Sequence, residues 1–565
     1  MVRKALVAGV ALLSMSTVVV GCGSSRSASV SSDSTRAAPP VGGIATAAPA
    51  LSGPAAATAA KAGAALPLVP EPSQVSALGG PGYQVSALTP VRFAGGSAAT
   101  AVAGELAAQL DASTGLRLPV RAAAQPESAA ASGGGGGGGG GVLLLLDPAA
   151  GTGPEGYRLA SGPTGVQITA TDGAGLFHGA QTLRQLLPAR GTGTVAAVRI
   201  TDQPRYPVRS VELDVARHFF PVPVVERVID LLSEYKFNYL HLHLTDDQGW
   251  RIQIPGLPRL TGIGAASEVG GGPGGYYTDA DYRAIVAYAA ARYVTVVPEV
   301  DLPAHTNAAL TAYPDLACAG TPRPRPYTAI GGAMDSLCTS SPEVDAFVNQ
   351  VVGELAALTP GPYLDIGGDE AFGVSHGAYE AFMARASAIV RAHGKQPVAW
   401  EDAAAAGSGG PALLGAWHPL PQLPAGLSGR LAAAVRSGAK VLLEPADHAY
   451  LDQKYDSGTR LGLDWAGYVG VRQAYDWNPG TFLQSRGVPA GSVAGVEAAL
   501  WTETLSTPAE LETMLLPRLP ALAEVGWTSQ ADRTWSGFQL RLAAQAPRWD
   551  AQGLAWTRAD GVPWQ

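Results

Sequence analysis

This 565-residue chain has few cysteines, few charged residues and no long apolar run, and each of these absences excludes a class of protein. It has only three cysteines and no Cys/His spacing typical of a zinc site, so the sequence predicts neither a bound metal nor a cofactor. Charged residues make up 15% of the chain, the formal net charge is -8 and no basic cluster is present, which argues against nucleic acid as a partner. What the chain does contain is apolar material, 47% of its residues, over a length that predicts two or three domains.

No apolar run is long enough for a comfortable membrane span, which needs about 20 residues. The run Ala5–Val20 is shorter and interrupted by polar residues, and it follows Arg3 and Lys4, as in an export signal. It ends in Val-Val-Gly-Cys, which resembles a bacterial lipobox and predicts a signal peptide over 1–22 with lipidation of Cys22. Ordinary signal cleavage nearby is the alternative. The expected location is the outer face of the plasma membrane, as a lipoprotein held only by its anchor, or the secreted fraction.

Residues 23–66 are mostly Ala, Ser, Gly, Pro and Thr, the composition of a disordered tether. If Cys22 carries lipid or is removed, two cysteines remain, Cys318 and Cys338. An exported chain meets oxidising conditions, so a disulfide between them is the expected pairing, and two separate buried thiols are the alternative.

Short apolar runs and amphipathic segments alternate over 67–204 and predict a small α+β domain. Strands are expected at 142–146 and 165–169, and helices at 98–110 and 179–187. Nine consecutive glycines, Gly133 to Gly141, lie within it; without the Lys and Ser/Thr of a phosphate-binding loop, they are interpreted as a surface insertion.

Buried strands and helices alternate over 205–565, the pattern of a parallel sheet. Eight strands in this span fit a (β/α)₈ TIM barrel better than an open sheet, and no G-x-G-x-x-G dinucleotide fingerprint follows the first strand. The predicted strands are 210–215, 239–244, 294–299, 363–366, 397–401, 413–417, 440–444 and 493–501.

Residues that follow the strands of such a barrel gather at one face, where these enzymes place their active sites. The predicted strand ends carry many carboxylates and tryptophans, which suits a neutral polyhydroxylated ring: carboxylates accept hydroxyl hydrogen bonds and aromatic faces cover C–H surface. Asp369 and Glu370 follow two glycines after the fourth strand. If they share a pocket, each is expected to raise the pKa of the other.

Five segments resemble one known family. In this order, LDVARHFFP, NYLHLHLTDDQGWRIQI, VVPEVDLPAHTNAAL, YLDIGGDEAF and AALWTET resemble the family 20 glycoside hydrolases, the exo-acting β-N-acetylhexosaminidases. The resemblance runs from about Tyr206 to Thr528, and the domain before it looks like the α+β domain that usually precedes the barrel in this family. The expected substrates are therefore β-linked N-acetylhexosaminides, including chitooligosaccharides.

The resemblance implies a role for each matching residue. Glu370 falls on the general acid/base, Asp369 on the residue that orients the substrate's 2-acetamido group, and Tyr450 on the hydroxyl that meets the acetamido oxygen. Asp246 and His305 match a pair beneath the acid that tunes its proton affinity. Sugar-hydroxyl contacts and aromatic walls are implied for Arg217, Asp452, Glu503, Trp400, Trp417, Trp465 and Trp501.

The adjacency of the two carboxylates then favours a particular mechanism. Ordinary retaining glycosidases hold acid and nucleophile about 5 to 5.5 Å apart across the scissile bond, whereas in substrate-assisted hydrolysis the acetamido carbonyl is the nucleophile. We therefore expect an exo-acting, retaining enzyme that removes terminal β-N-acetylglucosamine, with N-acetylgalactosamine also open. A disaccharide-releasing or transglycosylating relative, and a non-catalytic sugar-binding lipoprotein, are the alternatives.

Overall fold

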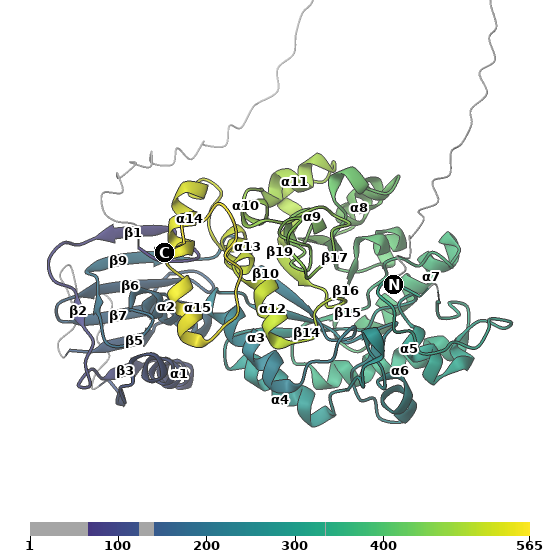
Figure 1. Ribbon diagram of the computed structural model, residues 1–565, viewed down its shortest axis with the longest axis horizontal. Helices are drawn as coiled ribbons and strands as arrows, with labels where there is room; N and C mark the ends of the chain where they lie inside the picture. The colour runs from purple at the N-terminus through teal and green to yellow at the C-terminus, as the bar shows by residue number, and fades with distance from the viewer. Residues whose placement is uncertain (1–65, 124–139, 334, 565) are drawn as a thin grey trace, which may run out of the picture. The chain divides into compact units, whose positions relative to one another are not determined.

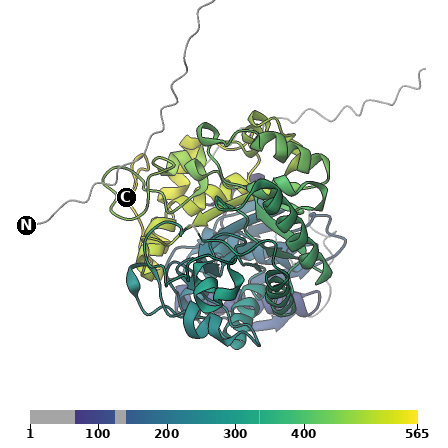
Figure 2. The same cartoon turned by 90° about the vertical axis from the view of Figure 1, so that its right-hand side faces the viewer.

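The computed structural model describes residues 66–123, 140–333 and 335–564. Eight parallel strands close into a barrel, with the last strand paired to the first (Figures 1 and 2). This confirms the predicted TIM barrel, and each predicted strand overlaps an observed one. The barrel strands are β10 (Val208–Asp214), β11 (Tyr239–His243), β14 (Thr295–Glu299), β15 (Tyr363–Asp365), β16 (Gln396–Trp400), β17 (Leu413–Ala416), β18 (Lys440–Leu443) and β19 (Val493–Leu500).

Helices surround the barrel, and some of them begin at a side-chain cap. Thr278 and Asp281 form a capping box that starts one helix, and Ser341 caps another whose first residue is Pro342. The longer helices of this layer are α3 (Val222–Glu234), α4 (Asp279–Ala290), α6 (Pro342–Leu358), α7 (His376–Ala392), α8 (Leu427–Arg436), α12 (Pro508–Leu515), α13 (Arg518–Trp527) and α14 (Trp535–Ala543). Shorter helices are α5 (Asn307–Ala312), α9 (Ala446–Ala449), α10 (Val471–Tyr475), α11 (Pro479–Ser485) and α15 (Ala546–Gln552).

Strand alternation sorts residues between the helical layer and the barrel interior. In β11, Leu240 and Leu242 belong to the main apolar core, so the alternating residues His241 and His243 point into the barrel. Near the start of the strands the interior is closed by a separate apolar cluster built on Val208, Val398, Leu413 and Leu442. The interior is therefore apolar at one end and polar further along.

A smaller domain precedes the barrel, as predicted. Its seven-stranded sheet has the order β1-β9-β6-β7-β5-β3-β4, and α1 (Ser97–Thr114) and α2 (Gly173–Leu186) pack against it. Both helices are longer than expected from the sequence. The strands are β1 (Gln74–Ala77), β3 (Val91–Ala94), β4 (Val120–Ala122), β5 (Val142–Leu146), β6 (Tyr157–Gly162), β7 (Gly165–Ala170) and β9 (Val198–Asp202), with a separate β2 (Tyr83–Gln84) and β8 (Thr194–Val195) pair. Most of the glycine insertion lies outside the described residues.

Polar side chains join this domain to the N-terminal ends of the barrel strands. Glu155 accepts a hydrogen bond from Arg209, the buried second residue of β10, and lies 3.0 Å from His178 Nε2. Asn238, at the start of β11, donates to Glu155 over 3.0 Å. Nearby, Lys236 lies 3.1 Å from Asp202. Each carboxylate at this junction therefore faces at least one cationic side chain.

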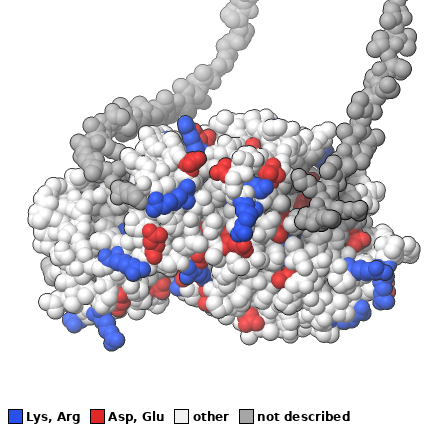
Figure 3. Space-filling view, viewed as in Figure 1, with Lys and Arg blue, Asp and Glu red and all other residues white. Residues whose placement is uncertain are grey.

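Cys318 and Cys338 form a disulfide with an S–S distance of 2.03 Å, which confirms the predicted pairing. Acidic and basic side chains are interspersed over the face shown in Figure 3, without a large region of either sign. Within the described residues, no helix is long and apolar enough to cross a membrane. Cys22 and the predicted signal peptide and tether lie outside those residues.

Candidate active site

The turn after β15 places two carboxylates at the C-terminal end of the barrel. Gly367 and Gly368 have φ values of 62° and 110°, in the region that favours glycine. A Cβ on Gly367 would lie 1.7 Å from Oδ1 of Asp301, and that oxygen accepts the backbone N–H of Gly368 over 3.0 Å. The strand has thus ended before Asp369, so the successive side chains of Asp369 and Glu370 can reach one site.

His305 lies between these two carboxylates. Its Nε2 is 3.5 Å from Oδ2 of Asp369 and 3.5 Å from Oε2 of Glu370. Both His305 and Glu370 have left-handed backbones, with φ values of 53° and 48°. Non-glycine residues rarely adopt this conformation unless their surroundings hold them in it. The contact is therefore built by two specialised backbone positions.

Asp246 contacts the other ring nitrogen of His305, Nδ1. Its carboxylate lies 3.3 Å from His305 Nδ1, 3.1 Å from His243 Nε2 and 2.8 Å from Arg217. Arg217 also lies 3.3 Å from Asp214, so it pairs with both carboxylates instead of serving only as a partner of Asp214. The chain Arg217–Asp246–His305 thus leads directly to Asp369 and Glu370.

The two neighbouring carboxylates differ in their proton affinity. Burial raises the pKa of Asp369 and Glu370 adds to the rise, although His305 opposes it. The contact with His305, 3.5 Å away, lowers the pKa of Glu370, whose side chain is 42% exposed. The expectation that each carboxylate raises the pKa of the other agrees with the direction for Asp369, whereas the pKa of Glu370 is lowered, chiefly by His305.

The imidazole itself is held in its charged form. Burial would lower the pKa of His305, but the negative charges of Asp246 and Asp369 raise it well above its ordinary value. An imidazolium with two carboxylates on one side, Asp246 and Asp247, and two on the other is a fixed positive charge. It stabilises the ionised forms of both Asp369 and Glu370.

Aromatic rings form a continuous wall beside the carboxylates. The Tyr450 ring centroid is 6.0 Å from those of both Trp465 and Trp501. Trp465 lies 6.0 Å from Trp417, and Trp400 lies 5.8 Å from Trp501. Trp400 and Tyr450 are buried, whereas Trp465 is 42% exposed and forms the outer edge. The four predicted tryptophans and the predicted tyrosine thus lie together.

Several buried polar atoms of the site meet no hydrogen-bond partner among the described residues. They are His305 Nε2, Asp369 Oδ1, Asp452 Oδ1, Trp501 Nε1 and Arg217 Nε. Burial raises the pKa of Asp452 to about 8, and the nearby Glu503 contributes to that rise. Buried polar groups normally find partners, so a concentration of unpartnered acceptors and donors beside an aromatic wall is the pattern of a site for a hydroxyl-bearing ligand.

The structure thus brings the predicted site residues into one region, and their individual roles remain predictions. Of three further residues that shape it, the sequence placed Asp301 after a strand without giving it a role, and sequence reasoning missed Tyr379 and His243. Asp301 holds the Gly367-Gly368 turn, Tyr379 donates to the Gly368 carbonyl over 2.5 Å, and His243 holds Asp246. Asp301 stands in the segment that contains His305, so its place after a strand was the available signal.

Comparisons with known proteins agree with this geometry. The model "Glycosyl hydrolase family 20, catalytic domain" matches residues 206–530, and the family's "domain 2" matches residues 65–203. A β-N-acetylhexosaminidase of Cellulomonas fimi is 45% identical over 418 residues, 73% of this chain and 82% of that protein. A β-hexosaminidase of Akkermansia muciniphila is 32% identical over 419 residues, 69% of this chain and 82% of that protein.

Solved structures show the same likeness. The N-acetyl-β-hexosaminidase of Streptomyces plicatus, in complex with Thio-NAglucal, has a TM-score of 0.82 and 47% identity, covering 88% of this chain and 98% of its own. The family 20 β-N-acetylhexosaminidase of Streptomyces coelicolor A3(2) has the same TM-score and identity, covering 88% of this chain and 99% of its own. The chain therefore belongs to glycosyl hydrolase family 20.

Proposed function

We propose that this protein is an exo-acting, retaining β-N-acetylhexosaminidase that uses the substrate's own acetamido group as nucleophile. One observation carries the proposal: Asp369 and Glu370 contact the same nitrogen of His305. They therefore face a ligand from one side, whereas the acid and nucleophile of an ordinary retaining glycosidase lie on opposite sides of the bond. The nucleophile that this pair lacks is the 2-acetamido carbonyl.

Asp369 accepts the acetamido N–H through Oδ1, the oxygen that has no protein partner among the described residues. Its negative charge then stabilises the positive charge that develops as the carbonyl oxygen attacks the anomeric carbon and an oxazolinium intermediate forms. Tyr450 is buried, and its pKa is raised well above the ordinary value, so it remains a neutral phenol that donates to the acetamido oxygen. These two contacts orient the nucleophile.

Glu370 protonates the leaving oxygen and then accepts a proton from the incoming water. The low pKa of Glu370 in the free enzyme means that it must gain a proton before the first step. A bound sugar covers its half-exposed carboxyl group, and the loss of solvation raises the pKa. Proton uptake on substrate binding is therefore part of the mechanism.

Paired nitrophenyl glycosides test this function. The β-N-acetylglucosaminide should be cleaved and the β-glucoside hardly at all, because the glucoside carries no internal nucleophile. Comparable rates would contradict the mechanism. Proton NMR of fresh product should show the β anomer, and initial α product would mean inversion. The galacto-configured acetamido substrate, run beside the gluco form, determines whether the site accepts both epimers, and chitooligosaccharides test a natural source of the sugar.

We also propose that the enzyme is exported and held at the outer face of the plasma membrane by a lipid on Cys22. The lipobox-like sequence supports the anchor, and the disulfide supports an oxidising compartment. Detergent phase partitioning of cells that express wild type and Cys22→Ser tests this. The wild type should enter the detergent phase and the variant should not; a wild type that stays in the aqueous phase would refute the anchor.

A further inference from the structure

The middle of the barrel interior carries charged side chains where such barrels usually contain branched apolar residues. They are contributed by six strands or strand ends, and each is at most 4% exposed. We call this set the interior layer. It consists of five carboxylic side chains, Glu212, Glu299, Asp365, Glu444 and Glu497, and two imidazoles, His241 and His243.

The two imidazoles already have carboxylate partners. His241 lies with Nδ1 3.1 Å from Glu497 and Nε2 3.2 Å from Glu299. His243 lies with Nδ1 2.5 Å from Glu299 and Nε2 3.1 Å from Asp246. Glu299 and Glu497 are thus neutralised by histidines, but two imidazoles cannot neutralise all five carboxylic groups of the layer.

Three carboxylic groups are left over. Asp365 accepts the backbone N–H of Gly367 over 2.8 Å; the other two are Glu212 and Glu444. Both are fully buried, and within the described residues neither oxygen of either side chain meets a hydrogen-bond donor. The nearest imidazole nitrogen to Glu212, Nδ1 of His243, is 3.9 Å away, too far for a hydrogen bond. Burying an ionised carboxylate without a partner costs several kcal/mol. The layer therefore requires either extra protons or a bound cation.

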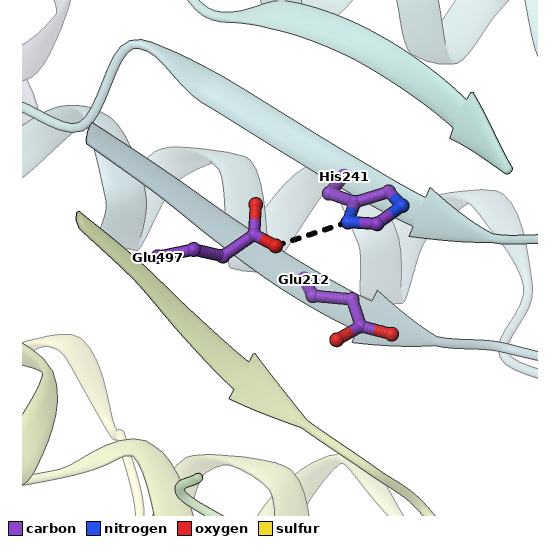
Figure 4. A group of neighbouring side chains, drawn as sticks. All are labelled: Glu212, His241 and Glu497. Atoms are coloured by element: carbon purple, nitrogen blue, oxygen red, sulfur yellow. Dashed lines mark hydrogen bonds and ion pairs between the residues drawn. The ribbon is translucent and has the colours of Figure 1, made fainter. Parts of the chain in front are cut away.

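The arrangement around Glu212 matches a cation better than isolated protons. Glu212 and His241 are directly opposite each other in the β10–β11 pair, and Glu497 lies on β19, the other neighbour of β10. One ligand atom from each of these three side chains lies within 4.8 Å of the other two. Figure 4 shows the contact between His241 and Glu497, with Glu212 on the neighbouring strand. A cavity of about 20 Å³ adjoins His241 and Glu497 and is also lined by Asp365, whereas Glu212 is not among its lining residues. It has room for one water molecule.

We propose that the interior layer binds one divalent transition-metal ion, of the Zn²⁺ or Mn²⁺ class, through Glu212, His241 and Glu497. Two carboxylates and one imidazole form a mixed oxygen and nitrogen ligand set that suits these ions, whereas Ca²⁺ prefers six to eight oxygen ligands. The ion takes the place of the proton between His241 Nδ1 and Glu497. Nε2 then donates to Glu299, the usual arrangement in which a second carboxylate orients a metal-bound histidine. A water molecule in the cavity completes the coordination.

The proposal is independent of the proposed reaction, because none of the three ligands has a role in that reaction. Sequence spacing could not reveal the site, since its ligands come from strands that are distant along the chain. The competing state is a metal-free layer in which both Glu212 and Glu444 are protonated, whereas with the ion bound only Glu444 is. Burial raises the pKa values of both residues in that state.

Metal content and thermal stability test the proposal in the full-length protein. The protein is stripped with a chelator, dialysed against Zn²⁺ or Mn²⁺ and then against metal-free buffer, and analysed by mass spectrometry for retained ions. We expect about one ion per chain and a melting temperature several degrees above that of the stripped protein. A wild type that retains no ion and shows no change in melting temperature would overturn the proposal, without requiring any variant.

Three variants locate the ion. Glu212→Gln keeps the shape of a protonated glutamate and should lose the retained ion. Asp365→Asn is the matched control, because Asp365 is also a buried carboxyl of the layer and lies on the other side of His241, 3.6 Å from Nε2; it should keep the ion. His305, Asp369 and Glu370 form a second group that could hold an ion, so Glu370→Gln tests whether the retained ion lies there instead. We expect this variant to keep the ion. Loss of the ion in either control, with retention in Glu212→Gln, would overturn the assignment.

Discussion

Two histidines at opposite ends of the barrel each contact a glutamate, but their proton affinities are shifted in opposite directions. His178, in the smaller domain, lies 3.0 Å from Glu155, and its pKa is lowered by burial, with the charges of Arg209 and Lys236 adding to the effect. His305, at the catalytic end, lies 3.5 Å from Glu370, and its pKa is raised well above the ordinary value despite burial. The pair is the same, but the surrounding charges differ in sign.

The surroundings also differ in how completely polar groups are matched. Around Glu155, Arg209, His178 and Asn238 all direct nitrogen atoms at one carboxylate. Around His305, four carboxylates compete for one imidazole and Asp369 Oδ1 stays without a partner among the described residues. A matched network stabilises one arrangement of the chain, whereas an unmatched one is completed by a ligand.

The largest expected effect is a loss of kcat, and it distinguishes Glu370 from Glu155. Glu370→Gln should lower kcat on a natural disaccharide by about 10²- to 10⁴-fold, the usual contribution of a general acid, with little change in melting temperature. Glu155→Gln should do the reverse, lowering the melting temperature while the folded protein keeps its kcat. Steady-state kinetics and calorimetry on both variants measure this. A catalytically normal Glu370→Gln would remove that residue from its proposed role.

Asp369→Asn should lower kcat by about 10²- to 10³-fold, the range for a lost electrostatic contact with the transition state. This loss of kcat should persist on a substrate with a good nitrophenolate leaving group. Such a group leaves without being protonated, so it removes the need for the general acid but not the need for Asp369. The loss in Glu370→Gln should shrink on the same substrate. Equal changes for the two variants on both substrates would mean that the carboxylates do not have separate roles.

Stability in acid should depend on Glu155. Burial opposes its ionisation, but the hydrogen bond from His178 and the charge of Arg209 lower its pKa from 4.5 to about 2. A depressed carboxyl pKa stabilises the fold above the unfolded-state pKa, and the contribution is lost as pH falls from about 4.5 to about 2; the full contribution is about 3 kcal/mol. Denaturant unfolding should therefore show a wild-type advantage over Glu155→Gln that is present at neutral pH and shrinks over that acid range.

The pH dependence of activity should respond to His305 and not to His178. Removing the imidazolium in His305→Asn raises the pKa values of both Asp369 and Glu370, because it favours the ionised form of each. Both limbs of the kcat/KM profile should therefore move to higher pH. His178→Asn is the matched control and should leave the profile in place. A profile that is unchanged in His305→Asn would contradict the proposed electrostatic role.

The smallest effect is expected at the outer edge of the aromatic wall. Trp465→Ala should raise KM about fivefold with little change in kcat, because a partly exposed ring contributes about 1 kcal/mol of contact with the sugar. Tyr468→Ala is a suitable control, since Tyr468 is 51% exposed and lies three residues further on. A similar rise in KM in both variants would show that the effect is not specific to the wall.

Much of the fold follows from local sequence. The alternation Tyr-Leu-His-Leu-His in β11 is enough to distinguish a helix-facing row of side chains from an interior row. The eight strands could be predicted because each is a short buried run between helical segments. The boundaries of α1 and α2 were less accurate, because small residues in both helices weaken their apolar periodicity.

The candidate site was predictable where its residues stand in contiguous motifs, as Asp369 and Glu370 do. The direction of the Glu370 pKa shift was not, because it depends on where the His305 ring lies in three dimensions. The interior layer was also hidden. Glu212, Glu444 and Glu497 stand in separate segments, and only the strand register shows that they converge.

The left-handed backbones of His305 and Glu370 have a consequence for engineering this enzyme. Such conformations cost about 1 kcal/mol or more each for ordinary residues, so glycine or asparagine at either position would relieve the strain while destroying the site. A screen that rewards only heat resistance would therefore enrich inactive variants at these two positions. Directed evolution of a more robust enzyme needs counter-selection for turnover from the first round.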